Sequence, residues 1–221
     1  LERFSPPDIR PADIPPETEG QQNLIPASVA NAPLRDITLF RSASVGRTPG
    51  TIARWLDLST VKRESGKKIK QTWWFLPPVL WPGEEENLKM AIDLALERHA
   101  RHFVLNIPWQ IALFDTPEKL NLWAGPFCNI ANGPHLHILR DMGFSGAFVS
   151  PELTQNDFLA LPGVSPLPLG VVMEGNWPLA ISRIISPEIS PDFPFSSPMG
   201  ESAWISKREN NYWIFPGWRL N

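Results

Sequence analysis

Between residues 71 and 174 the sequence alternates short apolar runs with segments of helical periodicity, and this alternation constrains the fold more than any other feature. The apolar runs cover residues 71–81, 102–107, 126–131, 146–150 and 169–174. These runs are mostly continuous rather than alternating, which is typical of parallel strands covered by helices. We therefore expect four strand–helix units followed by a fifth strand.

The helix predicted over residues 84–99 is the clearest of the series. Three glutamates open it, and carboxylates favour the positive end of the helix dipole. Apolar residues then recur at helical spacing, namely Leu88, Ala91, Ile92, Ala95 and Leu96. Three more helices are expected: a short one after Thr116, one over 134–143, and one through Leu161 that Thr154 and Asp157 cap.

Two earlier strand candidates, residues 37–42 and 54–59, raise the number of strands to seven, one fewer than a complete (β/α)₈ barrel has. We predict an α/β fold over residues 35–185, a partial or distorted TIM-like barrel. The Pro-rich residues 1–34 are predicted to form an extended arm. Residues 186–221 are predicted to form a C-terminal loop and a β-hairpin packed on the barrel, with strands at 203–207 and 212–215.

Composition limits the partners and cofactors that we expect. The net charge of −3 gives no overall positive field that would attract nucleic acid, and binding of nucleic acid is left as an open alternative. No apolar run approaches the ~20 residues of a membrane span, so no membrane partner is expected. Cys128 is the only cysteine, which excludes an intramolecular disulfide and fits a cytoplasmic location. Because the chain begins at Leu1, we expect it to be part of a longer protein.

Function in parallel α/β folds gathers at the carboxyl ends of the strands. The polar residues that follow the second to fifth predicted strands are Asn106, Asn129, Asn132, Glu152, Glu174 and Asn176, with Trp74, Trp109 and Trp177 as possible walls. Structural roles compete with function at three of them. Asn132 suits a helix cap, Glu152 directly precedes a helix, and Glu174 is a candidate ion-pair partner of Arg183.

The catalytic candidates are Glu174 and Glu152, which would form an acid/base pair if their surroundings separated their pKa values. His135 and His137 lie two residues apart, which places them on different faces of a helix, so no metal site is predicted. Cys128 lies in no recognisable nucleophile motif. The binding candidates are Arg183, Asn132, Asn106 and Asn176.

Several short motifs follow one another in a fixed order. They are "FLPPVLW" before an acidic helix, Asn129 and Asn132 before a helix with Leu136, Leu139 and Gly143, then "SPEL" at 150–153, and Glu174, Pro178, Leu179 and Arg183. In this order they resemble the second half of the U-thirty-two peptidase family, also called collagenase-like proteases. The similarity covers roughly residues 71–221, including the aromatic hairpin. It implies a TIM-like barrel in a longer chain and, by the family name, peptidase activity.

Other members of that family resemble hydroxylation factors for RNA or quinone precursors, which hold an iron–sulfur cluster on four cysteines. Three of those cysteines follow the position of Arg183, where this chain has none, so no cluster or other cofactor is expected. Two hypotheses follow. The first is a peptidase domain, and the second is a non-catalytic binding or scaffold domain for a peptide, a small anion, RNA, a second copy or a missing barrel half.

Overall fold

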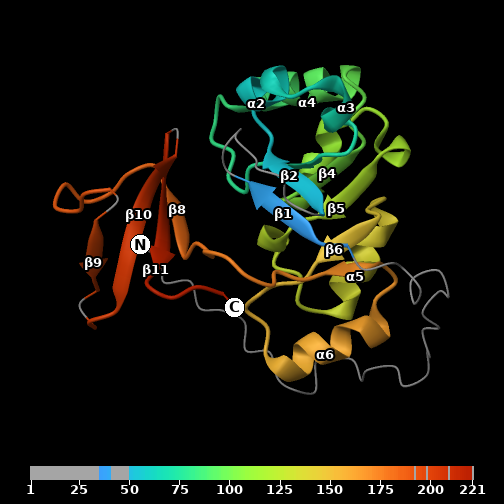
Figure 1. The fold of residues 1–221 in the computed structure, drawn as a ribbon. Coiled ribbons are helices and arrows are strands. Elements are labelled where there is room, and N and C mark those ends of the chain that lie inside the picture. Colours follow the sequence, from blue (N-terminus) through green and yellow to red (C-terminus); the bar gives the residue numbers. More distant parts are fainter. Residues whose placement is uncertain (1–34, 41–49, 192, 198, 209, 221) are drawn as a thin grey trace, which may run out of the picture.

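The computed structural model describes residues 35–40, 50–191, 193–197, 199–208 and 210–220, and the predicted arm at 1–34 lies outside them. Two sheets organise the described chain (Figure 1). One is a curled seven-stranded parallel sheet whose strands follow sequence order, and the other is a four-stranded antiparallel sheet beside it. The predicted α/β class with a barrel-like parallel sheet is thereby confirmed.

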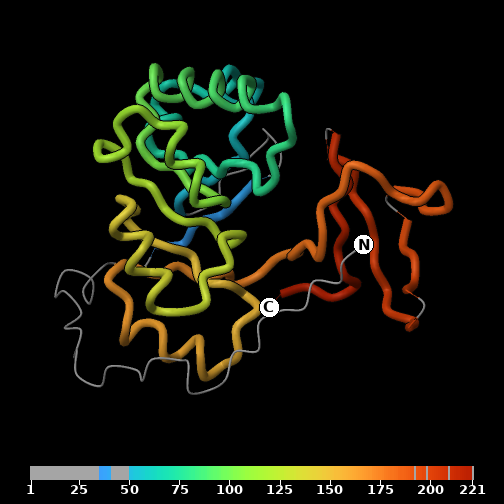
Figure 2. Tube along the Cα trace, turned by 180° about the vertical axis from the view of Figure 1, so that it is seen from behind, coloured from blue at the N-terminus to red at the C-terminus, as the bar shows by residue number. Residues whose placement is uncertain are grey.

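The parallel sheet consists of short strands joined by helical connections. Its strands are β1 (Ile37–Phe40), β2 (Thr51–Trp55), β3 (Trp73–Phe75), β4 (His102–Leu105), β5 (Asn121–Ala124), β6 (Gly146–Phe148) and β7 (Leu169–Gly170). The connections contain α2 (Leu58–Arg63), α3 (Gly66–Ile69), α4 (Glu85–Glu97), η2 (Pro108–Leu113), η3 (Pro117–Lys119), η4 (Pro126–Cys128), α5 (Gly133–Asp141) and α6 (Gln155–Val164). Figures 1 and 2 show α2, α3 and α4 grouped at one end of this unit, with α6 at the other.

The helices bury the outer face of the curled sheet. The apolar stripe of α4 packs there, as its periodicity predicts, against strand residues such as Trp74 and Phe103. One charged side chain is also buried in this unit. Arg54 of β2 pairs with Glu64, which follows α2, at 2.8 Å, and both side chains are at most one-tenth exposed. The pair ties a strand to the helical connection that follows it.

The inner face of the curled sheet is filled by aromatic rings. Phe75 of β3 contacts Phe148 of β6 at 6.1 Å between ring centroids, which shows how strongly the sheet curls. Two glycines make room for these rings. A Cβ on Gly146 would lie 2.3 Å from the Trp123 ring, and one on Gly170 would lie 2.7 Å from the Phe148 ring. Each of these two rings therefore occupies the space beside a glycine of the neighbouring strand, where a larger residue would place its side chain.

The second sheet has the order β8-β11-β10-β9, with β8 at Ala180–Ser182, β9 at Pro194–Ser196, β10 at Ser202–Arg208 and β11 at Asn211–Pro216. The predicted hairpin is confirmed as β10 and β11. β8 pairs with β11, although the prediction places its residues in the barrel-like domain. Gly175 and Leu220 exchange two backbone hydrogen bonds of 3.1 and 3.0 Å, so the two ends of this unit lie side by side.

Four predicted strands are wrong in position or in most of their length. The run at 71–81 forms a strand only at Trp73–Phe75. The run at 54–59 begins in β2, but its second half enters α2, which Asp57 caps. The run at 126–131 begins as a 3₁₀ turn at Pro126, which lacks the N–H that a ladder needs, and pairs only through an isolated bridge from Ile130 to Val149; the strand is instead Asn121–Ala124. The run at 169–174 ends as a strand at Gly170, after which Val171 and Met173 are exposed.

Candidate functional site

The carboxyl ends of the parallel strands face the four-stranded sheet across an aromatic contact, which we call the junction. Trp55, at the end of β2, meets Trp213 of β11 edge to face at 5.7 Å. Phe127, which follows β5, stacks on Trp177 at 4.6 Å and meets Trp213 at 6.2 Å. Three of these rings are half-buried, and Trp213 is buried. The four-stranded sheet therefore packs against the end of the parallel sheet where α/β folds place their sites.

Polar contacts reinforce the junction on the side of β3. Arg183, just after β8, forms an ion pair with Glu84, which precedes α4. The Arg183 guanidinium also lies 5.3 Å from the centre of the Trp81 ring. The Trp81 indole Nε1 donates a 2.7 Å hydrogen bond to Oδ1 of Asn211 on β11. These contacts fix the second sheet to the loop that follows β3.

Asn106 lies directly after β4, as predicted, and its side chain faces the interior. Val104, two residues earlier, belongs to the inner aromatic cluster, and a Cβ on Gly125 of the neighbouring strand end would lie 2.0 Å from Asn106 Oδ1. The Nδ2 group donates a 2.6 Å hydrogen bond to the carbonyl of Leu76, which fixes the orientation of the amide. Asn106 is 2% exposed, and Oδ1 has no hydrogen-bond partner among the described residues.

Gln110 of η2 holds the backbone around Asn106 in place. Its Oε1 accepts hydrogen bonds from the backbone N–H groups of Asn106 and Ile107, at 3.0 and 3.2 Å. Its Nε2 donates to the carbonyl of Pro77 at 2.8 Å. Every polar group of the two amides is therefore paired except Asn106 Oδ1. Sequence reasoning missed Gln110, although an amide four residues after a strand-end Asn is a visible signal.

A row of ring contacts connects the junction to the opposite end of the interior. Consecutive centroids lie 5.3–6.1 Å apart in the order Trp55, Phe75, Phe148, Trp123, Trp73 and His102. At its far end His102 stacks on Trp73, and its Nδ1 lies 2.9 Å from Nδ2 of Asn121. Burial, with a smaller contribution from the Arg35 charge, lowers the pKa of His102. The interior is thus apolar and aromatic, with polar groups at its ends.

The structure does not bring the two predicted catalytic carboxylates to the ends of adjacent strands. Glu174 is exposed and lies four residues past β7, so the prediction that it ends a strand is wrong. The structural alternative for Glu174, an ion pair with Arg183, is not what the structure shows, because Arg183 pairs with Glu84. Glu152 does reach the junction, where its Oε1 accepts a 3.4 Å hydrogen bond from Nε1 of Trp177.

The remaining predicted residues divide between the junction and structural roles. Asn132 caps α5 by accepting a hydrogen bond from the His135 backbone at 3.0 Å, which is the structural alternative. Asn129 ends η4 in the left-handed region, with φ of 52°, and not a strand. Asn176 is half-buried beside Trp177 in the sequence.

Of the three predicted walls, only Trp177 lies at the junction. Trp74 is fully buried on the outer face of the sheet, and Trp109 is an exposed residue of η2. The rings that Trp177 meets there, such as Phe127 and Trp213, were not predicted. A signal for them is present in the sequence, because aromatic residues follow β5 and crowd into the hairpin.

The thiol of Cys128 is held in its neutral form. Burial raises its pKa to about 12, against a smaller opposing effect of a hydrogen bond with the Gly125 backbone. The thiol donates to the Leu105 carbonyl at 3.2 Å. Within the described ranges, no three His, Cys, Asp or Glu side chains are grouped to hold a metal ion. No helix in the part of the chain that the structure describes has the length and apolar character to cross a bilayer.

Comparison with known proteins gives no identification, since no family model, curated protein or solved structure matches this chain.

Proposed function

We propose that the curled sheet is an incomplete TIM-like barrel that binds an extended peptide at its carboxyl end, as a domain of a longer protein. The observation that carries the proposal is the unpaired Oδ1 of Asn106. A buried acceptor without a donor costs about 1–3 kcal/mol, and a ligand that supplies an N–H group recovers that free energy. A binding role therefore gives a reason for an otherwise unfavourable group.

The surroundings of Asn106 favour a peptide over a small anion. An anion brings no donor for Oδ1. Of the cations that contact the junction, Arg183 is already paired with Glu84, and Arg208 lies over the Trp213 ring at 4.3 Å. A peptide backbone supplies N–H groups at regular intervals, and its side chains can pack on the half-buried rings of Trp55, Phe127 and Trp177. Oδ1 is covered in the present arrangement, so binding requires the cover over Asn106 to move.

Peptide hydrolysis is the second candidate function. It is supported by the resemblance to the collagenase-like peptidases and by the position of Glu152, whose carboxylate contacts Trp177 at the junction. In that case Glu152 acts on the bound peptide as a general base or acid. Both functions use the same surface and differ in whether the peptide is cut.

Peptides from denatured collagen test both functions. Binding is measured by tryptophan fluorescence and calorimetry, and cleavage is measured by mass spectrometry of the incubated peptides. We expect Asn106→Leu to weaken binding roughly tenfold or more, the effect of losing a buried hydrogen bond to the ligand. Asn156→Leu, at an exposed asparagine of α6, is the matched control and is expected to bind like the parent.

The outcomes separate the two functions. No binding by the parent, or equal binding by Asn106→Leu with the fold intact by circular dichroism, contradicts the binding proposal. Cleavage by the parent that is lost in Glu152→Gln supports the peptidase and assigns Glu152 to it. The exposed Glu174 tests the other predicted carboxylate in the same way, through Glu174→Gln.

A further inference from the structure

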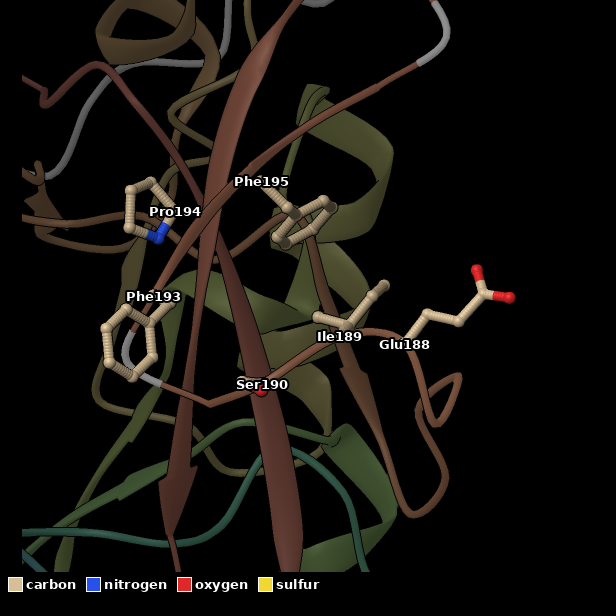
Figure 3. A pocket seen from close by; sticks show the side chains of 6 residues that line it. All are labelled: Glu188, Ile189, Ser190, Phe193, Pro194 and Phe195. Carbon is tan, nitrogen blue, oxygen red and sulfur yellow. The ribbon is translucent and has the colours of Figure 1, made fainter.

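A hollow of about 350 Å³ lies on the outer strand of the four-stranded sheet, away from the junction residues. It is lined by Glu188, Ile189, Ser190, Phe193, Pro194 and Phe195. Figure 3 shows Phe193 and Pro194 on one side and Ile189 and Phe195 on the other, with the Glu188 carboxylate directed away from the rings. Four of the six lining side chains are therefore apolar, while Ser190 and Glu188 are polar and Glu188 carries a negative charge.

The described residues leave apolar side chains near β9 exposed. Phe193 is 69% exposed, and Ile184 and Met199, which flank the segment, are more than four-fifths exposed. β9 is the outer strand of its sheet and pairs with β10 alone among the described strands. Large exposed apolar side chains beside a hollow favour an interaction surface there.

The shape and charge of the hollow select the partner. Its volume is near the lower end of the roughly 300–1,000 Å³ of ligand pockets, which suits one or two inserted side chains. The described charged residues nearest to β9 along the chain are Glu188 and Glu201, both carboxylates. A partner that places Lys or Arg beside its apolar anchor is attracted to them.

Strand addition along β9 is not the main contact. β9 has three residues and begins with Pro194, which has no N–H to donate, and both features protect sheet edges from pairing. Binding energy must therefore come from side chains that enter the hollow. We propose that the β9 hollow is a docking site for a partner polypeptide that inserts an aromatic or large aliphatic anchor flanked by a basic residue. This proposal does not depend on the peptide site at the junction.

Panning a random 12-residue peptide library on the full chain tests the proposal. We expect enrichment of peptides that combine an apolar anchor with a neighbouring Lys or Arg. Phe193→Ser is expected to weaken the best peptide roughly tenfold or more, as for an interface hot spot. Glu188→Lys is expected to weaken it by less, and added salt to weaken binding to the parent. Ile138→Ser, at a 58% exposed residue of α5, is the matched control.

Several results overturn the proposal. One is enrichment of peptides without basic residues, and another is binding that Phe193→Ser leaves unchanged. Competition of the selected peptides by collagen peptides at the junction also contradicts it, because the two sites are separate. A dimer of the parent that Phe193→Ser dissociates, measured by analytical ultracentrifugation, assigns the surface to a second copy instead. Thermal melts confirm that each variant is folded, as expected for exposed positions.

Discussion

Replacing Gly146 by alanine tests whether the aromatic rings of the interior are held as tightly as the structure indicates. The added Cβ would lie 2.3, 2.5 and 2.6 Å from three atoms of the Trp123 ring. Carbon atoms in ordinary contact are about 3.5–4.0 Å apart, so the ring must move by about 1 Å or more. The rings of Trp73 and Phe148 lie against it at 5.4 and 5.5 Å, and Nε1 donates to Asn121, so little space is open.

Overpacking of this kind typically costs about 1–3 kcal/mol, and the size of the overlap puts Gly146→Ala at the upper end. For a domain of this length, each kcal/mol shifts Tm by roughly 2–4 °C, so we expect Tm to fall by about 5–10 °C. Differential scanning calorimetry and urea unfolding measure the loss of stability. Near-ultraviolet circular dichroism is expected to change as well, because the tryptophan packing changes.

The matched control is Gly163→Ala in α6. No atom lies within 4 Å of its added Cβ, and alanine is favoured over glycine inside a helix by about 0.5–1 kcal/mol. This variant is therefore expected to raise Tm slightly. A Gly146→Ala variant that unfolds at the parent Tm or above refutes the inference that Trp123 is fixed by its neighbours.

Three further predictions follow from contacts described above. Glu64→Ala removes the carboxylate that contacts the buried Arg54 guanidinium at 2.8 Å, so unfolding in urea is expected to show a loss of stability of about 1–3 kcal/mol; a variant as stable as the parent contradicts a contribution of this pair. The raised pKa of Cys128 keeps the folded thiol neutral, so we expect it to react with a disulfide reagent at pH 8 only when the chain unfolds. Because the thiol ionises at lower pH in the unfolded chain, the free energy of unfolding should fall as pH rises from 9 towards 12. Fast labelling of the folded chain contradicts a buried, neutral thiol. Arg183→Ala removes a partly exposed pair with Glu84, so stability should change by less than about 1 kcal/mol while proteolysis at 171–179 accelerates, and an unchanged digestion rate contradicts the role of this pair at the junction.

The order of strands and helices from β3 to β7 was predictable from the sequence, but α2, α3, β8, β9 and the exact strand boundaries were not. The stripe on α4 and the hairpin were visible because their periodicity extends over many residues. β5 was misplaced because its four residues alternate between the two faces, while the more apolar run after it begins with a 3₁₀ turn at Pro126 and pairs only at Ile130. The run after Gly170 has β-forming residues but no neighbouring strand, and strand propensity depends on such neighbours.

The candidate site was predictable only in part for a related reason. Asn106 could be identified because it directly follows a predicted strand, and in a parallel sheet the carboxyl ends of the strands lie at the same edge. The partners at the junction come from a second sheet, and sequence spacing carries no information about which of its faces meets the first. Arg183 illustrates this limit, since its partner Glu84 lies 99 residues earlier in the chain.

The backbone pairing of Gly175 with Leu220 has a consequence for how this chain can change in evolution. The four-stranded unit starts at Gly175 and finishes at Leu220, so its two ends lie side by side. Segments with adjacent ends are the ones that chains gain, lose and exchange most readily. The unit that carries the β9 hollow has this end geometry, so we expect its exchange to alter the β9 surface while the barrel-like sheet stays the same.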